Sequence, residues 1–248
     1  MTDRLKDKVC LIIGATSGIG KAMTKLFAKE GGQVVFTGRR EEKGKALEEE
    51  VKEAGYKARF FQADATSAED NDKLISFMKE EYGRIDVLCN NSGILMNSAF
   101  EDIDLENEFD KMVNVNVRAQ FDMIQRVIPI MRENGGGSIV NTASVGAIQA
   151  LPYHVTYATT KAAVKHMTES LAVELAGDKI RVNNLCPGLT RSEMVTEGSD
   201  FENNVLPNVP LGRPASADEI ANGALFLASD ESSYVTGMSM VMDGGLTL

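Results

Sequence analysis

Short apolar segments alternate with longer amphipathic segments along the whole chain. The apolar segments hold many Val, Ile, Leu and Phe residues and few charges, and they lie at 9–13, 33–37, 58–62, 85–89, 138–142, 180–185 and 238–242. Helical periodicity appears near 18–31, 41–54, 67–82, 106–132, 153–176 and 217–228. Strands that are apolar on both faces belong to a parallel sheet covered by helices. Because parallel crossovers are right-handed, this order predicts an α/β fold with a doubly wound sheet.

One segment, residues 190–214, matches neither pattern. It contains Pro207, Pro210 and Pro214 and lies between the sixth predicted strand and the last predicted helix. A structureless segment of this length inside a compact domain is usually functional. We interpret it as a mobile flap over an active site.

Composition narrows the class of protein. The chain has 248 residues, 43% of them hydrophobic, which suits a single domain over residues 1–248. Its formal net charge of −10 disfavours nucleic acid and anionic membranes as partners. Residues 1–8 mix both charge signs and do not predict a signal peptide, and no apolar run is long enough to predict a membrane span.

Cysteine and histidine usage points to an intracellular protein without a metal site. Cys10, Cys89 and Cys186 fall in or beside predicted strands and form no Cys-x-x-Cys pair. We therefore expect reduced thiols in the core of a cytoplasmic protein. His154 and His166 are the only histidines, which makes a zinc site improbable.

A glycine-rich turn follows the first predicted strand and opens the first predicted helix. Gly14 permits a tight turn, and Gly18 and Gly20 permit close backbone approach to a phosphate and to the helix. The free N–H groups of the helix start favour an anion. The order of strand, turn and helix therefore predicts a dinucleotide site, with candidate contacts at Gly14, Thr16, Ser17, Gly18, Ile19 and Gly20.

The end of the second predicted strand bears on the choice of nucleotide. An acidic residue there would bind the adenosine ribose 2′-hydroxyl and select NAD. The sequence instead has Gly38, Arg39 and Arg40, and guanidinium groups suit a 2′-phosphate. We predict NADP(H) as the preferred cofactor, with NAD(H) possible; the alternative is that both arginines are solvated surface residues. Ser17 stands where a basic residue within the glycine turn would strengthen the case.

Polar residues also follow the third and fourth predicted strands. Asp64, next to Ala65, is placed to bind the adenine amino group, and a turn aspartate is the alternative. Asn90, Asn91 and Gly93 suit either a turn or the floor of a cofactor cleft. We include all five as candidate cofactor contacts.

Three residues form a candidate proton-handling site. Tyr157 and Lys161 are four residues apart on a predicted helix and so share one face, and Ser144 lies thirteen residues before Tyr157. A lysine ammonium beside a phenol favours the phenolate, so we expect the Tyr157 pKa to fall from its ordinary value of about 10 towards neutrality. The Ser144 hydroxyl can hold a carbonyl oxygen near that phenol. Taken singly, each residue also fits an ordinary structural role.

Taken together in this order, the motifs resemble the short-chain dehydrogenase/reductase family along essentially the whole chain. The elements that carry the resemblance are Gly14–Gly20, Asp64, Asn90-Asn-Ser-Gly93, Asn116, Ser144, Tyr157-x-x-x-Lys161 and Pro187-Gly188. The resemblance implies a single Rossmann-type domain with a seven-stranded parallel sheet. It also implies 4-pro-S hydride transfer between a nicotinamide and a carbonyl or alcohol, and a homotetramer.

The resemblance also implies residue roles. Tyr157 is the general acid and base, Lys161 lowers its pKa and binds the nicotinamide ribose, Ser144 polarises the substrate oxygen, and Asn116 holds a water in a proton relay. Tyr157 and Lys161 thus count among the cofactor contacts, and the carboxamide is bordered by Pro187, Gly188, Thr190 and Ser192. The chain departs from the family pattern at Ile13, Ser92, Thr159-Thr160 and Thr190. These departures remove no group that the mechanism needs.

The substrate is left open by the sequence. Candidate pocket residues are mainly apolar: Leu95, Met96, Val145, Ile148, Leu151, Tyr153, His154, Met194, Val195 and Leu206. They favour a medium or bulky apolar ketone or secondary alcohol, a class that includes hydroxysteroids. One alternative is a 3-oxoacyl-[acyl-carrier-protein] reductase, but that acidic partner requires a basic rim where the helix ends read Arg132-Glu133 and Asp178-Lys179. Another is a cofactor-sensing module without catalysis, which would not need the Tyr157–Lys161 pair.

Overall fold

The fold is built on one sheet of seven parallel strands in the order β3-β2-β1-β4-β5-β6-β7. The computed structural model describes residues 3–193 and 195–248. The chain reverses its winding between β1 and β4, where Ile13 pairs with Asn90. The strands are β1 Val9–Ile13, β2 Gln33–Gly38, β3 Ala58–Gln62, β4 Val87–Asn90, β5 Gly137–Thr142, β6 Ile180–Pro187 and β7 Ser239–Met242. The predicted doubly wound sheet is confirmed.

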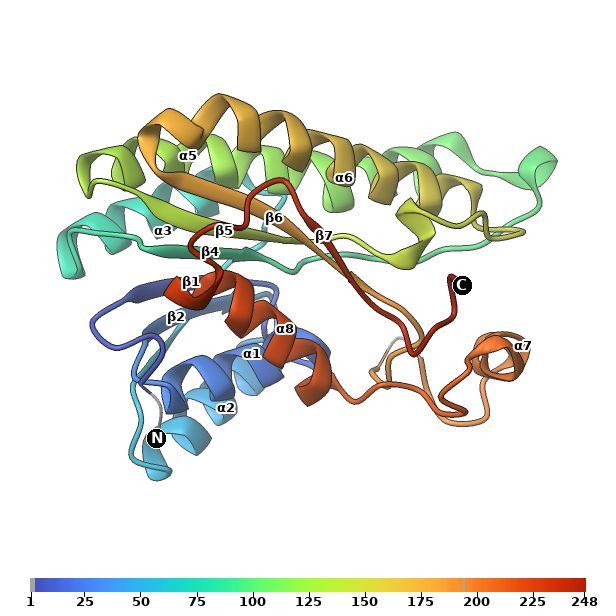
Figure 1. The fold of residues 1–248 in the computed structure, drawn as a ribbon, viewed down its shortest axis with the longest axis horizontal. Coiled ribbons are helices and arrows are strands. Elements are labelled where there is room, and N and C mark those ends of the chain that lie inside the picture. The colour runs from blue at the N-terminus through green and yellow to red at the C-terminus, as the bar shows by residue number, and fades with distance from the viewer. Residues whose placement is uncertain (1–2, 194) are drawn as a thin grey trace.

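Helices cover both faces of this sheet (Figure 1). One layer holds α1 (Gly18–Lys29), α2 (Glu41–Glu53) and α8 (Ala217–Ala228), and α1 packs against α8. The other layer holds α3 (Ala68–Glu81), α5 (Ala119–Glu133) and α6 (Val155–Leu175). The chain between β6 and α8 extends beyond the sheet, where α7 (Asp200–Val205) lies on the same side as the C-terminus.

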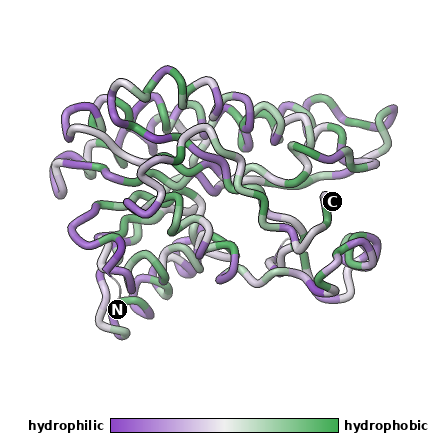
Figure 2. Tube along the Cα trace, viewed as in Figure 1, coloured by the Kyte–Doolittle hydropathy of each residue, from purple (hydrophilic) through white to green (hydrophobic). Residues whose placement is uncertain are grey.

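The sheet separates two large apolar cores. Alternate residues of β1 point to opposite faces: Cys10 and Ile12 join the α1/α8 side, whereas Leu11 and Ile13 join the α3/α5 side. Figure 2 accordingly shows mainly hydrophobic strands through the centre and helices that alternate in polarity. Cys10, Cys89 and Cys186 are buried, unpaired thiols, as expected.

The long helix predicted over 106–132 is interrupted. Two π-helical segments, Leu105–Asp110 and Asn114–Arg118, flank a single α-turn, α4 (Lys111–Val113), before α5 begins. A π-segment widens the helix by one residue per turn and changes where its side chains point. Apolar periodicity alone does not distinguish this arrangement from a continuous α-helix, and the second π-segment carries Asn116.

The segment 190–214 is more ordered than predicted, because it contains α7 and a 3₁₀ turn, η6 (Leu206–Asn208). Ser199 caps α7 by accepting from the Glu202 backbone N–H at 3.3 Å. The buried carboxylate of Glu202 binds Arg191 at 2.7 Å and accepts from the Gly198 N–H at 2.7 Å. Serine followed three residues later by glutamate is a helix-start pattern, so the sequence did contain this signal.

Candidate active site

The glycine turn after β1 is closely packed. Gly14 has φ +79°, and a Cβ there would lie 2.4 Å from the Ser92 Oγ. A Cβ on Gly20 would lie 2.4 Å from the Gly14 carbonyl oxygen. Asn91, at the end of β4, braces the turn by donating to that same carbonyl at 2.8 Å. These positions require glycine because neighbouring backbone occupies the space of a side chain.

The start of α1 fits an anion. Its N-cap residue, Ser17, makes no side-chain hydrogen bond to the helix, and the first turn contains no acidic residue. The N–H groups of that turn are therefore free of a capping side chain and lie at the positive end of the helix. Ile19 is partly buried against the core beneath. The residues present thus fit the pyrophosphate of a dinucleotide.

The end of β2 is cationic and closed to an acidic residue. A Cβ on Gly38 would lie 2.5 Å from the Thr16 Cγ2, so a carboxylate cannot stand there without displacing Thr16. The Arg40 guanidinium donates to the Thr16 Oγ1 at 3.1 Å and to the Ser17 Oγ at 2.6 Å. Lys43, in the first turn of α2, lies beside Arg40, since both bind the Glu193 carboxylate.

Asp64 and Arg39 lie next to this cationic group. Asp64 Oδ1 accepts from the Thr66 N–H at 2.9 Å and from the Thr66 hydroxyl at 2.7 Å, which is the turn geometry named as its alternative. Its second oxygen lies 3.8 Å from the guanidinium of the exposed Arg39. Ala65 contributes a backbone carbonyl that accepts from Asn71. Asp64 thus keeps one loosely held carboxylate oxygen that faces the end of β2.

Asn90 is the last residue of β4 and pairs with Asn141 on β5. Its side chain is buried in the sheet and donates to the Asn141 Oδ1 on β5 at 3.0 Å. Asn141 continues this buried chain to Thr168 on α6, and Thr168 donates to Asn184 on β6. Asn90 therefore links the central strands, while its neighbour Asn91 braces the glycine turn.

Ser144 and Tyr157 form the core of the candidate catalytic group. Ser144 follows β5, is buried, and accepts from the Gly146 N–H at 3.1 Å. Its hydroxyl lies beside the Tyr157 ring, because a Cβ on Gly146 would be 3.5 Å from the Ser144 Oγ and 3.6 Å from the Tyr157 Cε1. Burial raises the pKa of Tyr157 more than the Ser144 hydroxyl lowers it. The expected fall in the phenol pKa is therefore wrong for this arrangement of side chains.

Lys161 lies one turn along α6 from Tyr157. Its ammonium is 5.7 Å from the centroid of the Tyr157 ring and donates to the Thr142 backbone carbonyl at 2.8 Å. Burial lowers the Lys161 pKa to about 8. The two side chains are adjacent as predicted, and the ammonium faces the phenol ring while it binds the carbonyl at the end of β5.

Asn116 connects this group to the loop after β4. Its Oδ1 accepts from the Ile94 N–H at 2.8 Å, and its Nδ2 donates to the Ile94 carbonyl at 3.0 Å and to the Thr160 Oγ1 at 3.1 Å. Gly93 lies between the two polar groups, since a Cβ there would be 3.3 Å from the Lys161 Nζ and 3.5 Å from the Asn116 Oδ1. Asn116 thus fixes the loop against α6.

The loop after β6 lies at the same carboxyl edge of the sheet. Gly188, after Pro187, donates to the Met242 carbonyl at 3.0 Å, and Thr190 is buried with its hydroxyl on the Gly188 carbonyl. The chain then reaches Ser192, whose Cβ lies 3.5 Å from the position of a Cβ on Gly18. The loop therefore passes directly over the start of α1.

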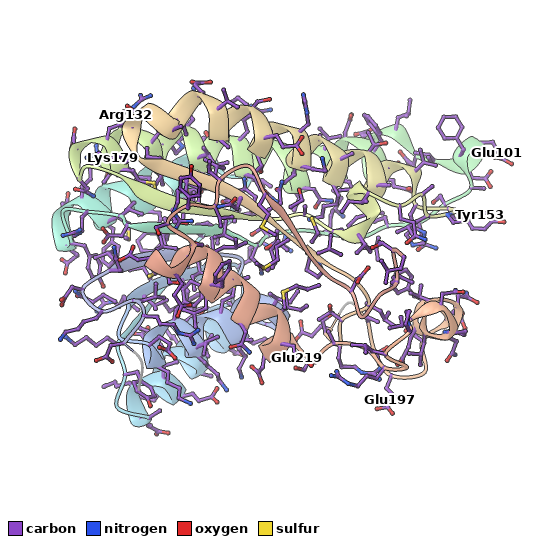
Figure 3. All side chains as sticks on the ribbon, viewed as in Figure 1. Glu101, Arg132, Tyr153, Lys179, Glu197 and Glu219 are labelled. Atoms are coloured by element: carbon purple, nitrogen blue, oxygen red, sulfur yellow. The ribbon has the colours of Figure 1, made fainter. Side chains whose placement is uncertain are left out.

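Several predicted pocket residues pack within the flap. Val195 and Leu206 join a small apolar cluster with Leu189 and Val209. The His154 ring contacts the Phe201 ring in a tilted arrangement, with 5.5 Å between ring centroids, and Met194 lies outside the described residues. Of the remaining candidates, Val145 is buried beside Ser144, and Leu151 approaches Gly146. Tyr153 is exposed and projects at the outer end of the molecule (Figure 3).

Two of the cavities in the described residues lie at opposite edges of the sheet. One of about 370 Å³ lies beside the start of α1 and is lined by Thr16, Ser17, Gly18, Lys21, Lys43 and Glu193. A larger one of about 710 Å³ is lined by the amino ends of β4, β5 and β6. Because that edge is opposite to Ser144 and Tyr157, we assign the larger cavity no part in the reaction.

Comparison with known proteins decides the family. The family described as Enoyl-(Acyl carrier protein) reductase, of the short-chain type, matches residues 14–247. The chain belongs to the short-chain dehydrogenase/reductase family. It is 41% identical over 246 residues to the 3-oxoacyl-[acyl-carrier-protein] reductase FabG of Thermotoga maritima, with 99% of this chain and 100% of that protein covered. It is 40% identical over 244 residues to a 3alpha-hydroxysteroid dehydrogenase of Mediterraneibacter gnavus, with 97% of each covered.

Solved structures agree on the fold. A gluconate 5-dehydrogenase from Burkholderia cenocepacia, in complex with NADP and tartrate, superimposes with a TM-score of 0.93 at 30% identity, covering 99% of this chain and 97% of that one. The protein is thus a short-chain oxidoreductase that uses NAD(P)(H) to interconvert a carbonyl and an alcohol on a small molecule. No helix among residues 3–193 and 195–248 is long and apolar enough to cross a membrane.

Lys43 and Glu193 were not among the predicted site residues. Lys43 stands within a charge-rich helix that reads as a solvated surface. Glu193 is 150 residues further along the chain, and only the fold brings it to Arg40 and Lys43. A third basic residue soon after Arg39 and Arg40 is the signal that could have found Lys43.

Proposed function

We propose that this protein is an NADP(H)-preferring oxidoreductase that interconverts an apolar ketone and a secondary alcohol. The observation that carries the reaction is the group at the carboxyl edge of β5, where the Ser144 hydroxyl lies beside the Tyr157 ring and the Lys161 ammonium lies against that ring. That group lies on the same edge of the sheet as the glycine turn after β1. Ligands bind outside this edge in doubly wound folds.

The proposed mechanism needs no metal ligand. When bound, the nicotinamide supplies or accepts the hydride. The Ser144 hydroxyl holds the substrate oxygen, and the Tyr157 phenol donates its proton to that oxygen during reduction and takes it back during oxidation. The Lys161 ammonium lies between the Tyr157 ring and Gly93 in the loop after β4. Asn116 positions the loop after β4 against Thr160, next to Lys161.

We further propose the following residues as cofactor contacts. The start of α1 holds the pyrophosphate, and Arg40 and Lys43 bind the adenosine 2′-phosphate as a pair of cations. Asp64 accepts from the adenine amino group with its second carboxylate oxygen. The carboxamide is bordered by Gly188, Thr190 and Ser192. The support for NADP(H) is that position 38 excludes an acidic side chain while two cations stand beside it.

A free small molecule is the substrate class that we favour. Val145 and Leu151 give the wall beside Ser144 an apolar character. At the end of α5, Arg132 is paired with Asp178 at 2.7 Å and so does not supply an unpaired cation for an acidic carrier protein. The second candidate is reduction of a 3-oxoacyl group on acyl carrier protein, which is the activity in the name of the Thermotoga maritima relative.

One assay separates these candidates. Oxidation of NADPH and of NADH is followed with a panel of bulky ketones and 3-oxosteroids, and with an acetoacetyl thioester of acyl carrier protein. The proposal predicts faster turnover of apolar ketones and a higher kcat/KM with NADPH. Higher kcat/KM for the carrier-protein thioester would favour the second candidate, and a higher value with NADH would overturn the cofactor preference.

A further inference from the structure

A carboxylate of the flap already occupies the cationic site at the end of β2. One Glu193 oxygen accepts from the Arg40 guanidinium at 2.6 Å, and the other binds the Lys43 ammonium. The Ser17 hydroxyl accepts from the same Arg40 guanidinium at 2.6 Å and lines the same cavity as Glu193. Lys43 and Arg40 together lower the Glu193 pKa to about 2, so the carboxylate is ionised at neutral pH.

The two partners of Glu193 are the groups that a nucleotide carrying a 2′-phosphate needs. Arg40 and Lys43 are the two cations beside Gly38, and Ser17 stands at the start of α1. A carboxylate and a phosphate monoester offer the same kind of anionic oxygens to such cations. Both anions cannot use the pair at once, because bringing them together would repel like charges.

The flap reaches this place by a short path from the catalytic edge. Ser192 lies against Gly18, and Glu193 follows it directly. The neighbouring acidic residue of the flap, Glu197, points away from the body of the molecule (Figure 3). Glu193 is therefore the flap carboxylate that meets the nucleotide site, and Glu197 provides a matched control with the same charge.

We propose that Glu193 is a specificity residue for the cofactor, because its carboxylate competes with the adenosine 2′-phosphate for Arg40 and Lys43. This inference rests on the proposed NADP(H) preference. NADP(H) has to displace Glu193 from both cations, whereas NAD(H), with a hydroxyl in place of the phosphate, can bind while that contact persists. Arg40 and Lys43 alone would favour NADP(H) over NAD(H) by a certain ratio of affinities. Glu193 makes that ratio smaller.

The test is equilibrium binding of two nucleotides that differ only in the 2′-phosphate. Adenosine 2′,5′-bisphosphate and adenosine 5′-monophosphate are titrated by calorimetry into the full chain, into its Glu193→Gln, Glu197→Gln and Arg40→Gln variants, and into the double variant Glu193→Gln/Arg40→Gln. Both probes lack the nicotinamide, so contacts of the flap with the carboxamide do not enter. Far-UV circular dichroism confirms that each variant is folded.

We expect Glu193→Gln to bind the bisphosphate about three- to tenfold more tightly than the wild type, since one competing charged partner of two cations is removed. The monophosphate should keep its wild-type Kd in this variant, and Glu197→Gln should leave both Kd values unchanged. In the double variant Glu193→Gln/Arg40→Gln the gain should be largely lost, because one cation of the pair is gone.

Two results would overturn the inference while leaving the NADP(H) preference intact. They are an unchanged bisphosphate Kd in Glu193→Gln, and an equal gain for both nucleotides, which would mean that the flap only obstructs access. The proposed preference itself fails in a different way. In that case the wild type would bind the bisphosphate no more tightly than the monophosphate, and Arg40→Gln would change neither value.

Discussion

At the scale of single residues, burial shifts the pKa values of the two ionisable groups that we propose as catalytic in opposite directions. It raises the pKa of the Tyr157 phenol and lowers that of the Lys161 ammonium to about 8. Both shifts favour the neutral form of the group. At neutral pH the phenol is therefore protonated, which is the state that carbonyl reduction requires, and Lys161 still carries most of its charge.

The lowered Lys161 pKa predicts a pH dependence of stability. An unfolded lysine titrates near 10.5, so between about pH 8 and 10.5 the unfolded chain binds more protons at this site than the folded chain. The contribution of Lys161 to the free energy of unfolding should then rise with pH across this window, by at most about 3 kcal/mol. Urea denaturation of the wild type and of Lys161→Met gives this contribution as the difference between two pH profiles.

The two pH profiles have to be subtracted because other groups also titrate between about pH 8 and 10.5. The raised pKa values of Tyr157, Cys10 and Cys89 act in the opposite direction, since their unfolded forms lose protons first. Cys10 and Cys89 are buried in both proteins, so the effect of these two thiols cancels. Parallel profiles for the wild type and Lys161→Met would contradict a buried, destabilised ammonium.

At the scale of elements, the strands and most helices could be predicted because their patterns are local. The five residues of β1 are all buried, and a short apolar run that ends at a glycine turn is typical of a buried strand. The π-segment around Asn116 could not be predicted, since a one-residue widening leaves the apolar pattern almost unchanged. Among site residues, Tyr157 and Lys161 were found by their spacing on one helix, whereas the contact of Glu193 with Lys43 depends on the fold.

The hydrogen bonds of Asn116, in this π-segment, should contribute to the free energy of unfolding. Asn116→Ala removes three hydrogen bonds and leaves the Ile94 N–H and carbonyl without these partners. We expect a loss of about 2 kcal/mol in the free energy of unfolding, together with a lower kcat, because the loop after β4 is released from α6. Urea denaturation and steady-state kinetics measure both.

Asn114→Ala is the matched control, because Asn114 lies in the same π-segment and is only partly buried. It should change the free energy of unfolding by less than about 0.5 kcal/mol. Equal losses in the two variants would show that the segment, and not the Asn116 contacts, determines the effect.

At the scale of the whole molecule, the helical layer of α5 and α6 exposes large apolar side chains. Phe121 on α5 is 55% exposed and Val173 on α6 is 83% exposed. Exposed apolar groups of this size gather where chains associate. They are consistent with the homotetramer that the family resemblance implies, which we retain as a proposal.

Light scattering after size-exclusion chromatography tests this assembly. We expect a mass about four times the 26.9 kDa of one chain. Introducing charge at the exposed positions, as Phe121→Glu and Val173→Glu, should shift the protein to smaller species while the circular dichroism spectrum is retained. A wild-type mass equal to one chain would refute the proposed tetramer.

The central claim is that the Tyr157 phenol transfers the proton while the nucleotide binds independently at the start of α1. Tyr157→Phe removes one oxygen atom and leaves the ring beneath Lys161. In this variant we expect kcat to fall by at least about 100-fold and the Kd for NADPH to stay within about twofold of the wild type. A Tyr157→Phe enzyme that turns over ketones at the wild-type rate would contradict the account.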